Sequence, residues 1–103
     1  MTKYKIIYTD TFFIELDSLI DVILYQYKAP LTAKRYLEGL RKEIKYLELI
    51  AGSLPYCRNK SVVDKFGTNF KRLNYKKVSI LFYVDGQNVY LISILPQSGI
   101  YGV

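Results

Sequence analysis

Two amphipathic helical patterns follow one another in the first half of this sequence, and they restrict the fold more than any other feature. In the first pattern, apolar residues recur at spacings of three and four, as in a helix with one apolar stripe: Phe12, Phe13, Leu16, Leu19, Ile20, Ile23, Leu24 and Tyr27. The second pattern has the same spacing, at Ala33, Tyr36, Leu37, Leu40, Ile44 and Leu47. Only a few residues separate the two patterns, so the sequence predicts an antiparallel helical hairpin.

Local signals predict where these two helices begin and end. Asp10 is the predicted N-cap of the first helix, and Ala29 followed by Pro30 ends it, because a residue before proline avoids the α region. Thr32 is the predicted N-cap of the second helix, which ends at Gly52 to Pro55. Gly39 lies inside the second helix, where glycine costs about 1 kcal/mol relative to alanine. We therefore expect a close contact with a neighbouring element at Gly39.

Strand patterns lie on both sides of the hairpin. Residues 3–8 predict a first strand, with alternate side chains half covered by the core. Residues 56–68 predict a loop that contains one short extended or helical turn. Three further strands are predicted at 70–74, 78–84 and 89–95, joined by tight turns at 74–77 and 85–88.

This order predicts an α+β fold in which a two-helix hairpin packs on one face of an antiparallel sheet. The opposite face should be concave or tyrosine-lined and partly open to a partner. With 103 residues, the chain has room for one domain, residues 1–103. The predicted core consists of Phe12, Phe13, Leu16, Ile20, Ile23, Leu37, Leu40, Ile44, Leu47, Ile80, Phe82, Leu91 and Ile94.

The composition excludes several chemistries. The chain has no histidine and one cysteine, Cys57, which rules out a zinc site, a Ser-His-Asp triad and a structural disulfide. No cofactor is predicted, and Cys57 is expected to be a small packing residue. The sequence also has no apolar run near 20 residues and no signal-peptide pattern, so we expect a cytoplasmic protein without a membrane partner.

The positive charge is concentrated in the second half of the chain. The net charge of +6 divides into +1 for residues 1–50 and +5 for residues 51–103, which suggests an anionic partner. The candidate binding residues are Arg58, Lys60, Lys65, Lys71, Arg72, Lys76 and Lys77, interleaved with Tyr56, Phe66, Phe70 and Tyr75. A solvated strand rim and a binding patch are both compatible with this pattern.

The sequence resembles the RelE/ParE superfamily of toxins from bacterial type II toxin–antitoxin operons. The similarity covers nearly the whole chain and rests on element order and on scattered apolar and basic positions. These are a Tyr4-x-Ile6 strand, Ala33-Lys34-Arg35-Tyr36 at the start of the second helix, Phe70-Lys71-Arg72-Leu73, and the apolar runs Ile80 to Val84 and Val89 to Leu95. The resemblance implies a cognate antitoxin as a partner, and we expect an acidic, amphipathic antitoxin segment to bind the exposed sheet face and the cluster from Arg58 to Lys77.

Two activities follow from this resemblance. RelE-like members cleave mRNA on the ribosome, whereas ParE-like members inhibit DNA gyrase without being nucleases. RNA cleavage needs a base, an acid and cations. Ser79 stands where the nuclease branch usually carries an Arg, and Pro96-Gln97 stands where many members carry a His-Arg or similar pair. The resemblance therefore favours the ParE-like branch.

Two alternatives stay open. A RelE-like nuclease acting on the ribosome and mRNA would draw on Lys71, Arg72, Tyr75, Lys76 and Lys77, with the cations stabilising charge and Tyr75 stacking or relaying a proton. A nucleic-acid-binding module without toxicity would use the net charge and the eleven tyrosines for binding and stacking.

Overall fold

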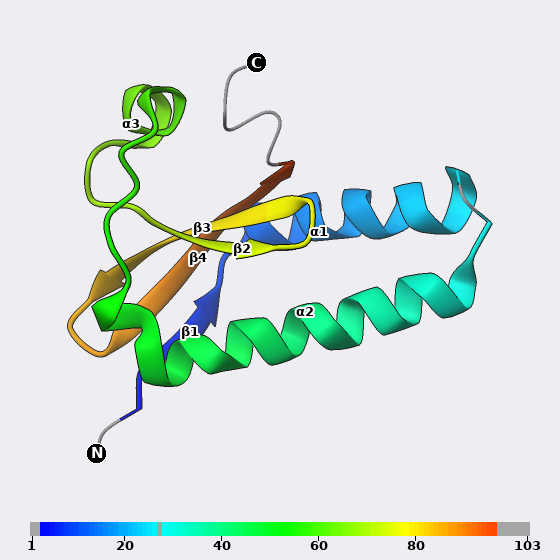
Figure 1. Cartoon of the computed structure of the whole chain (residues 1–103), viewed down its shortest axis with the longest axis horizontal. Coiled ribbons are helices and arrows are strands. Elements are labelled where there is room, and N and C mark those ends of the chain that lie inside the picture. Colours follow the sequence, from blue (N-terminus) through cyan, green and yellow to red (C-terminus); the bar gives the residue numbers. More distant parts are fainter. Residues whose placement is uncertain (1–2, 27, 97–103) are drawn as a thin grey trace.

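The computed structural model of the chain describes residues 3–26 and 28–96. Its elements, in chain order, are β1 (Lys5–Tyr8), α1 (Asp10–Asp21), η1 (Val22–Gln26), α2 (Pro30–Ile50), η2 (Ala51–Ser53), α3 (Lys60–Phe66), β2 (Lys71–Tyr75), β3 (Val78–Asp85) and β4 (Asn88–Pro96) (Figure 1). η1 is a π-helical turn and η2 is a 3-10 turn. The predicted order of a strand, two helices and three strands is confirmed.

The four strands form one sheet in the order β1-β4-β3-β2. β2, β3 and β4 pair antiparallel, as predicted. β1 instead pairs parallel with β4, with Ile6 opposite Val89 and Tyr8 opposite Leu91. The sheet is therefore mixed rather than antiparallel throughout. A parallel pair needs a long crossover connection, which the helices between β1 and the rest of the sheet supply.

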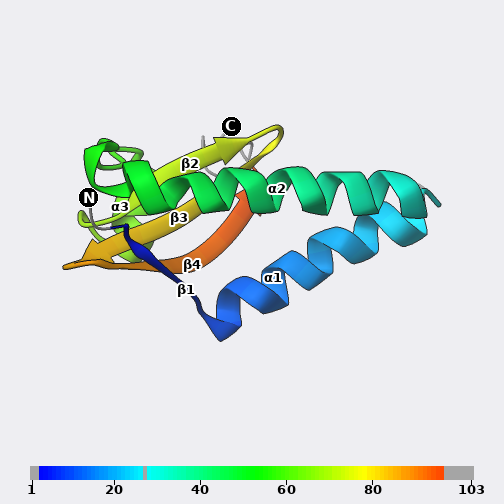
Figure 2. The same cartoon turned by 90° about the horizontal axis from the view of Figure 1, so that it is seen from below.

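The hairpin of α1 and α2 packs on the sheet and extends beyond its end (Figures 1 and 2). Thr9, not Asp10, is the N-cap of α1: its hydroxyl accepts from the Phe12 N–H at 3.3 Å and donates to the Leu91 carbonyl at 2.7 Å. α2 begins at Pro30 rather than after Thr32, because proline is favoured in the first helical turn. α2 has 21 residues, yet within 3–26 and 28–96 no helix is apolar enough over a sufficient length to cross a membrane.

The predicted 56–68 loop contains the seven-residue helix α3. Asn59 caps it by accepting hydrogen bonds from the backbone N–H groups of Ser61 and Val62, at 3.0 and 3.4 Å. Val62 packs with Cys57 and Leu81 in a small second core cluster. Because Leu81 lies between two β3 residues that face the main core, α3 covers part of the opposite sheet face.

The main core lies between the hairpin and the sheet. Eight of the predicted core residues are buried: Phe12, Leu40, Ile44, Leu47, Ile80, Phe82, Leu91 and Ile94. Leu16, Ile20, Ile23 and Leu37 are half-buried. Phe13 is 48% exposed, so its assignment to the core was wrong; it stacks on Tyr8 with ring centroids 5.3 Å apart. Tyr27, which ended the predicted stripe of the first helix, lies outside the described residues.

Gly39 makes the close contact that its position predicts. A Cβ atom added there would collide with the Tyr75 hydroxyl, and the next ring carbon of Tyr75 would lie at 3.2 Å. Tyr75 belongs to β2, so this contact holds the middle of α2 against the edge strand. The glycine thus permits close helix–strand packing that outweighs its low helix propensity.

We expect Gly39→Ala to be coupled to the Tyr75 hydroxyl. Alanine in an exposed helix interior would add about 1 kcal/mol of stability, but here Tyr75 must move to admit the new methyl group. In a Tyr75→Phe background the collision is removed, so Gly39→Ala should be more favourable there by about 1 kcal/mol. Urea unfolding of the four chains measures this coupling. Tyr46→Phe, at an exposed position of the same helix, is the matched control and should combine additively with Gly39→Ala. Additive behaviour with Tyr75→Phe would contradict the prediction.

Candidate functional site

The alternation of side chains along β2 sends two adjacent predicted site residues to opposite faces of the sheet. Lys71 faces the helical side and is only 6% exposed. Its ammonium group donates to the carbonyl oxygens of Ala51 and Gly52 at 3.3 and 3.1 Å and lies 4.8 Å from the Tyr56 ring centroid. Lys71 therefore ties β2 to the C-terminal end of α2, where carbonyl groups lack helical partners.

Arg72 lines a hollow on the other side of β2. The hollow has a volume of about 400 Å³ and is lined by Pro55, Tyr56, Cys57, Arg58, Asn59, Arg72 and Asn74. Of the seven predicted cations, Arg58 and Arg72 are brought together here. Two guanidinium groups beside two asparagine amides suit an anionic ligand such as a phosphate or a carboxylate.

The same hollow holds few groups for acid–base chemistry. Its described lining contains no carboxylate, and the chain has no histidine. Ser79, which the resemblance aligns with an Arg usual in the nuclease branch, is fully buried and donates to the Asn74 side-chain oxygen at 2.6 Å. Pro96 is exposed at the end of β4, and Gln97 lies outside the described residues. Among residues 3–26 and 28–96, no group of histidine, cysteine or acidic side chains could hold a metal ion.

The remaining predicted cations occupy two other places. Lys60 and Lys65 belong to α3, and the Lys65 ammonium lies 5.3 Å from the Phe66 ring centroid. Lys76 and Lys77 form the turn between β2 and β3, where Lys76 has a left-handed φ of 52°. The seven predicted cations therefore do not form one cluster. One is buried against the end of α2, two line the hollow, two belong to α3, and two lie in the turn between β2 and β3.

The turn cation Lys76 packs against two phenol rings that reach it from different elements. Its ammonium lies 5.6 Å from the Tyr36 centroid and 5.4 Å from the Tyr75 centroid, and the two rings meet edge to face at 5.3 Å. Burial raises the pKa of Tyr36 to about 12, and Tyr75 adds to the shift. Lys76, Tyr36 and Tyr75 thus pack together as a corner between α2 and the β2–β3 turn. Tyr75, a predicted catalytic residue of the nuclease alternative, lies in this corner and does not line the hollow.

A row of aromatic rings crosses the sheet face opposite the hairpin. Phe66 and Phe70 have centroids 5.5 Å apart, Phe70 and Tyr83 5.5 Å, and Tyr83 and Tyr90 4.9 Å with nearly parallel planes. All four side chains are half-buried. The predicted tyrosine-lined face is present, and α3 covers one end of it.

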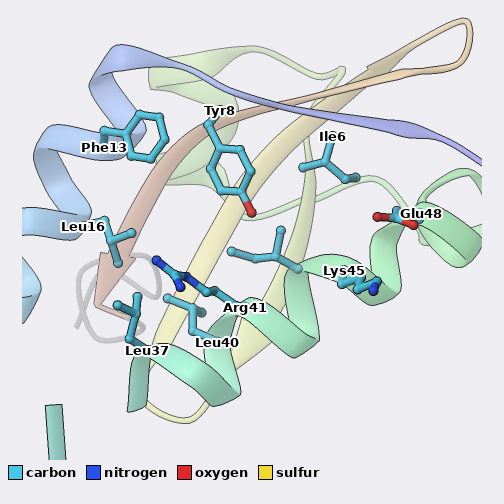
Figure 3. A pocket seen from close by; sticks show the side chains of 10 residues that line it. Ile6, Tyr8, Phe13, Leu16, Leu37, Leu40, Arg41, Lys45 and Glu48 are labelled. Atoms are coloured by element: carbon cyan, nitrogen blue, oxygen red, sulfur yellow. The ribbon is translucent and has the colours of Figure 1, made fainter. Parts of the chain in front are cut away.

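A groove that the sequence analysis did not predict opens between α1, α2 and β1 (Figure 3). Its volume is about 540 Å³, and its lining is Ile6, Tyr8, Phe13, Leu16, Leu37, Leu40, Arg41, Ile44, Lys45 and Glu48. Most of these side chains are apolar. The first helix carries more apolar residues than one sheet face can cover. This excess of apolar residues was the feature of the sequence that could have indicated the groove.

Charged side chains lie at one side of the groove, on α2. Arg41 and Lys45 are one helical turn apart, and both are exposed. Burial raises the pKa of the Tyr8 phenol, while Arg41 lowers it and Glu48 raises it. The groove thus combines an apolar lining with a mouth that carries two cations and one carboxylate.

The fold was compared with those of known proteins. No protein-family model and no curated protein matches the sequence. A solved structure of the chromosomal ParDE toxin–antitoxin system from P. aeruginosa matches with a TM-score of 0.73 and 18% identity, over 91% of this chain and 96% of that chain. This chain has a RelE/ParE-like fold. The toxin–antitoxin complex RelBE2 from Mycobacterium tuberculosis also matches, with a TM-score of 0.64 and 12% identity, over 91% of this chain and 98% of that chain. The RelE/ParE fold therefore accounts for nearly the whole length of the chain.

Proposed function

We propose that this chain is the toxin of a bacterial type II toxin–antitoxin pair, that it inhibits DNA gyrase by binding it, and that a cognate antitoxin neutralises it in the cytoplasm. The observation that carries the proposal is an apolar groove that also carries two cations and one carboxylate, on a chain with a RelE/ParE-like fold. The two similar structures are themselves toxin–antitoxin systems.

The groove suits an acidic, amphipathic antitoxin segment that folds as it binds. Apolar side chains of such a segment would replace water against Leu16, Leu37 and Ile44, and its carboxylates would meet Arg41 and Lys45. The cations of the second half supply longer-range attraction that acts mainly on the association rate: Arg58, Lys60, Lys65, Arg72, Lys76 and Lys77. Lys71 does not belong to this surface, because it is buried and its ammonium group donates to backbone carbonyls.

Inhibition of gyrase by binding demands less of these residues than RNA cleavage. Attack by a ribose 2′-hydroxyl needs a group to accept its proton and another to protonate the leaving oxygen. The Arg58 and Arg72 hollow offers charge stabilisation without a carboxylate or an imidazole among its described lining residues. A binding inhibitor needs only a surface, so the ParE-like activity is our first candidate.

One observation favours a second candidate, a RelE-like mRNA endonuclease. The same hollow places two guanidinium groups beside Tyr56, and the aromatic row crosses the adjoining sheet face. Cations near stacking rings are typical of surfaces that bind single-stranded RNA. A nucleic-acid-binding module without toxicity would use the same surface.

Two assays on the induced and purified chain separate these candidates. We expect the chain to block gyrase-dependent supercoiling, and we expect mapped mRNA ends to show no codon-specific cuts. Arg72→Ala should retain the block on supercoiling, because inhibition by binding needs no stabilisation of a transition-state charge in the hollow. Codon-specific cuts that fall about a hundredfold in Arg72→Ala or in Lys77→Ala would favour the nuclease instead.

A further inference from the structure

The far end of the helical hairpin exposes apolar side chains that the fold does not use. We define the hairpin tip as residues 22–26 and 28–35, which lie in η1, before α2 and in the first turns of α2. The tip projects past the end of the sheet (Figures 1 and 2). Tyr25 is 77% exposed, Leu31 58% and Val22 45%. No described residue between Leu19 and Tyr36 belongs to either core cluster.

The charge of the hairpin tip is of one sign. Residues 22–35 contain three cations, Lys28, Lys34 and Arg35, and no carboxylate. All three side chains are exposed. An apolar patch edged by cations is complementary to an apolar slot edged by carboxylates.

Other occupants fit the hairpin tip less well. A second copy of the chain would bring two tips of charge +3 together, and the like charges would repel. A nucleic-acid backbone would use the cations but leave Val22 and Leu31 without a partner. A bilayer surface takes up a helix with a free apolar face along its length, whereas past the tip the apolar face of α2, at Leu40, Ile44 and Leu47, is buried in the main core.

We propose that the hairpin tip is the surface through which this chain contacts its target protein, with Tyr25 and Leu31 entering an apolar slot edged by carboxylates. The inference rests on the proposed function, because it assigns a contact surface to the gyrase inhibitor. The antitoxin groove lies toward the sheet end of the same helices, at Phe13, Leu16 and Arg41. The hairpin thus carries two different surfaces, one at each end.

The test compares a tip variant, Tyr25→Ser with Leu31→Ser, with a control that alters two exposed α2 residues far from the tip, Tyr46→Ser with Leu49→Ser. Growth arrest on induction, affinity for purified gyrase and affinity for the antitoxin are measured for each. We expect the tip variant to lose about 30-fold or more in gyrase affinity and to lose growth arrest, as for a central interface anchor. The control should match the unmodified chain, and both variants should keep their antitoxin affinity.

Each other outcome of this test has a defined meaning. If the tip variant arrests growth and binds gyrase like the unmodified chain, the tip inference is overturned while the proposed function stands. If the unmodified chain arrests growth without binding gyrase, the proposed target is wrong, and the tip inference that rests on it is overturned with it. Binding to phosphatidylglycerol vesicles that disappears in the tip variant would assign the tip to a bilayer and overturn a protein slot.

Discussion

Reversal of the two cations at the mouth of the groove, by Arg41→Glu and Lys45→Glu together, should lower the affinity of the chain for its antitoxin by about a hundredfold. Both side chains line the groove, and both would then repel the carboxylates of an acidic segment. The probe is the cognate antitoxin that we propose, produced as a purified protein. Titration calorimetry at two salt concentrations measures the affinity and its dependence on charge.

Lys42→Glu is the matched control for this double reversal. Lys42 lies between the two cations on α2 and is exposed, but it does not line the groove. The control should change the affinity by less than about threefold, as a peripheral charge does. Equal losses in Lys42→Glu and in the double reversal would show that general charge, not the groove, attracts the antitoxin.

Leu40→Ala should lower the free energy of unfolding by about 2–5 kcal/mol, a large share of the stability of a small domain. Leu40 is fully buried in the main core and lies where α2 meets the sheet. In a domain of this size, such a loss corresponds to a fall in melting temperature of at least about 8 °C. Thermal and urea unfolding both measure it.

Leu49→Ala provides the comparison, because Leu49 is on the same helix but exposed. Its removal should change the stability by less than about 0.5 kcal/mol. A cost below about 1 kcal/mol for Leu40→Ala would mean that α2 turns a different face to the sheet.

The hairpin and the antiparallel strands were predictable because their signals are local. The spacing of Leu40, Ile44 and Leu47 identifies one helix face, and all three are buried. Gly39 was informative because an unfavourable residue in a helix needs a compensating contact, which Tyr75 supplies. These features depend only on the period of the helix and on neighbours in sequence.

The partner of β1 and the groove were not predictable from local patterns. A parallel pair joins segments more than 80 residues apart, and no turn signal marks it. Phe13 has the spacing of the apolar stripe, but the sheet face does not cover it, and it lines the groove instead. Lys71 and Arg72 are adjacent cations, and only the register of β2 shows that one is buried and the other lines the hollow.

The pairing of β1 with β4 has a consequence for how this chain is made. During synthesis the hairpin can form early, because its contacts are close in sequence. β1 pairs only with β4, and the Thr9 hydroxyl next to β1 donates to the Leu91 carbonyl of β4. β1 therefore cannot join the sheet until β4 has been synthesised. One wall of the groove is therefore built last, and a nascent chain lacks the complete groove until β4 has been synthesised.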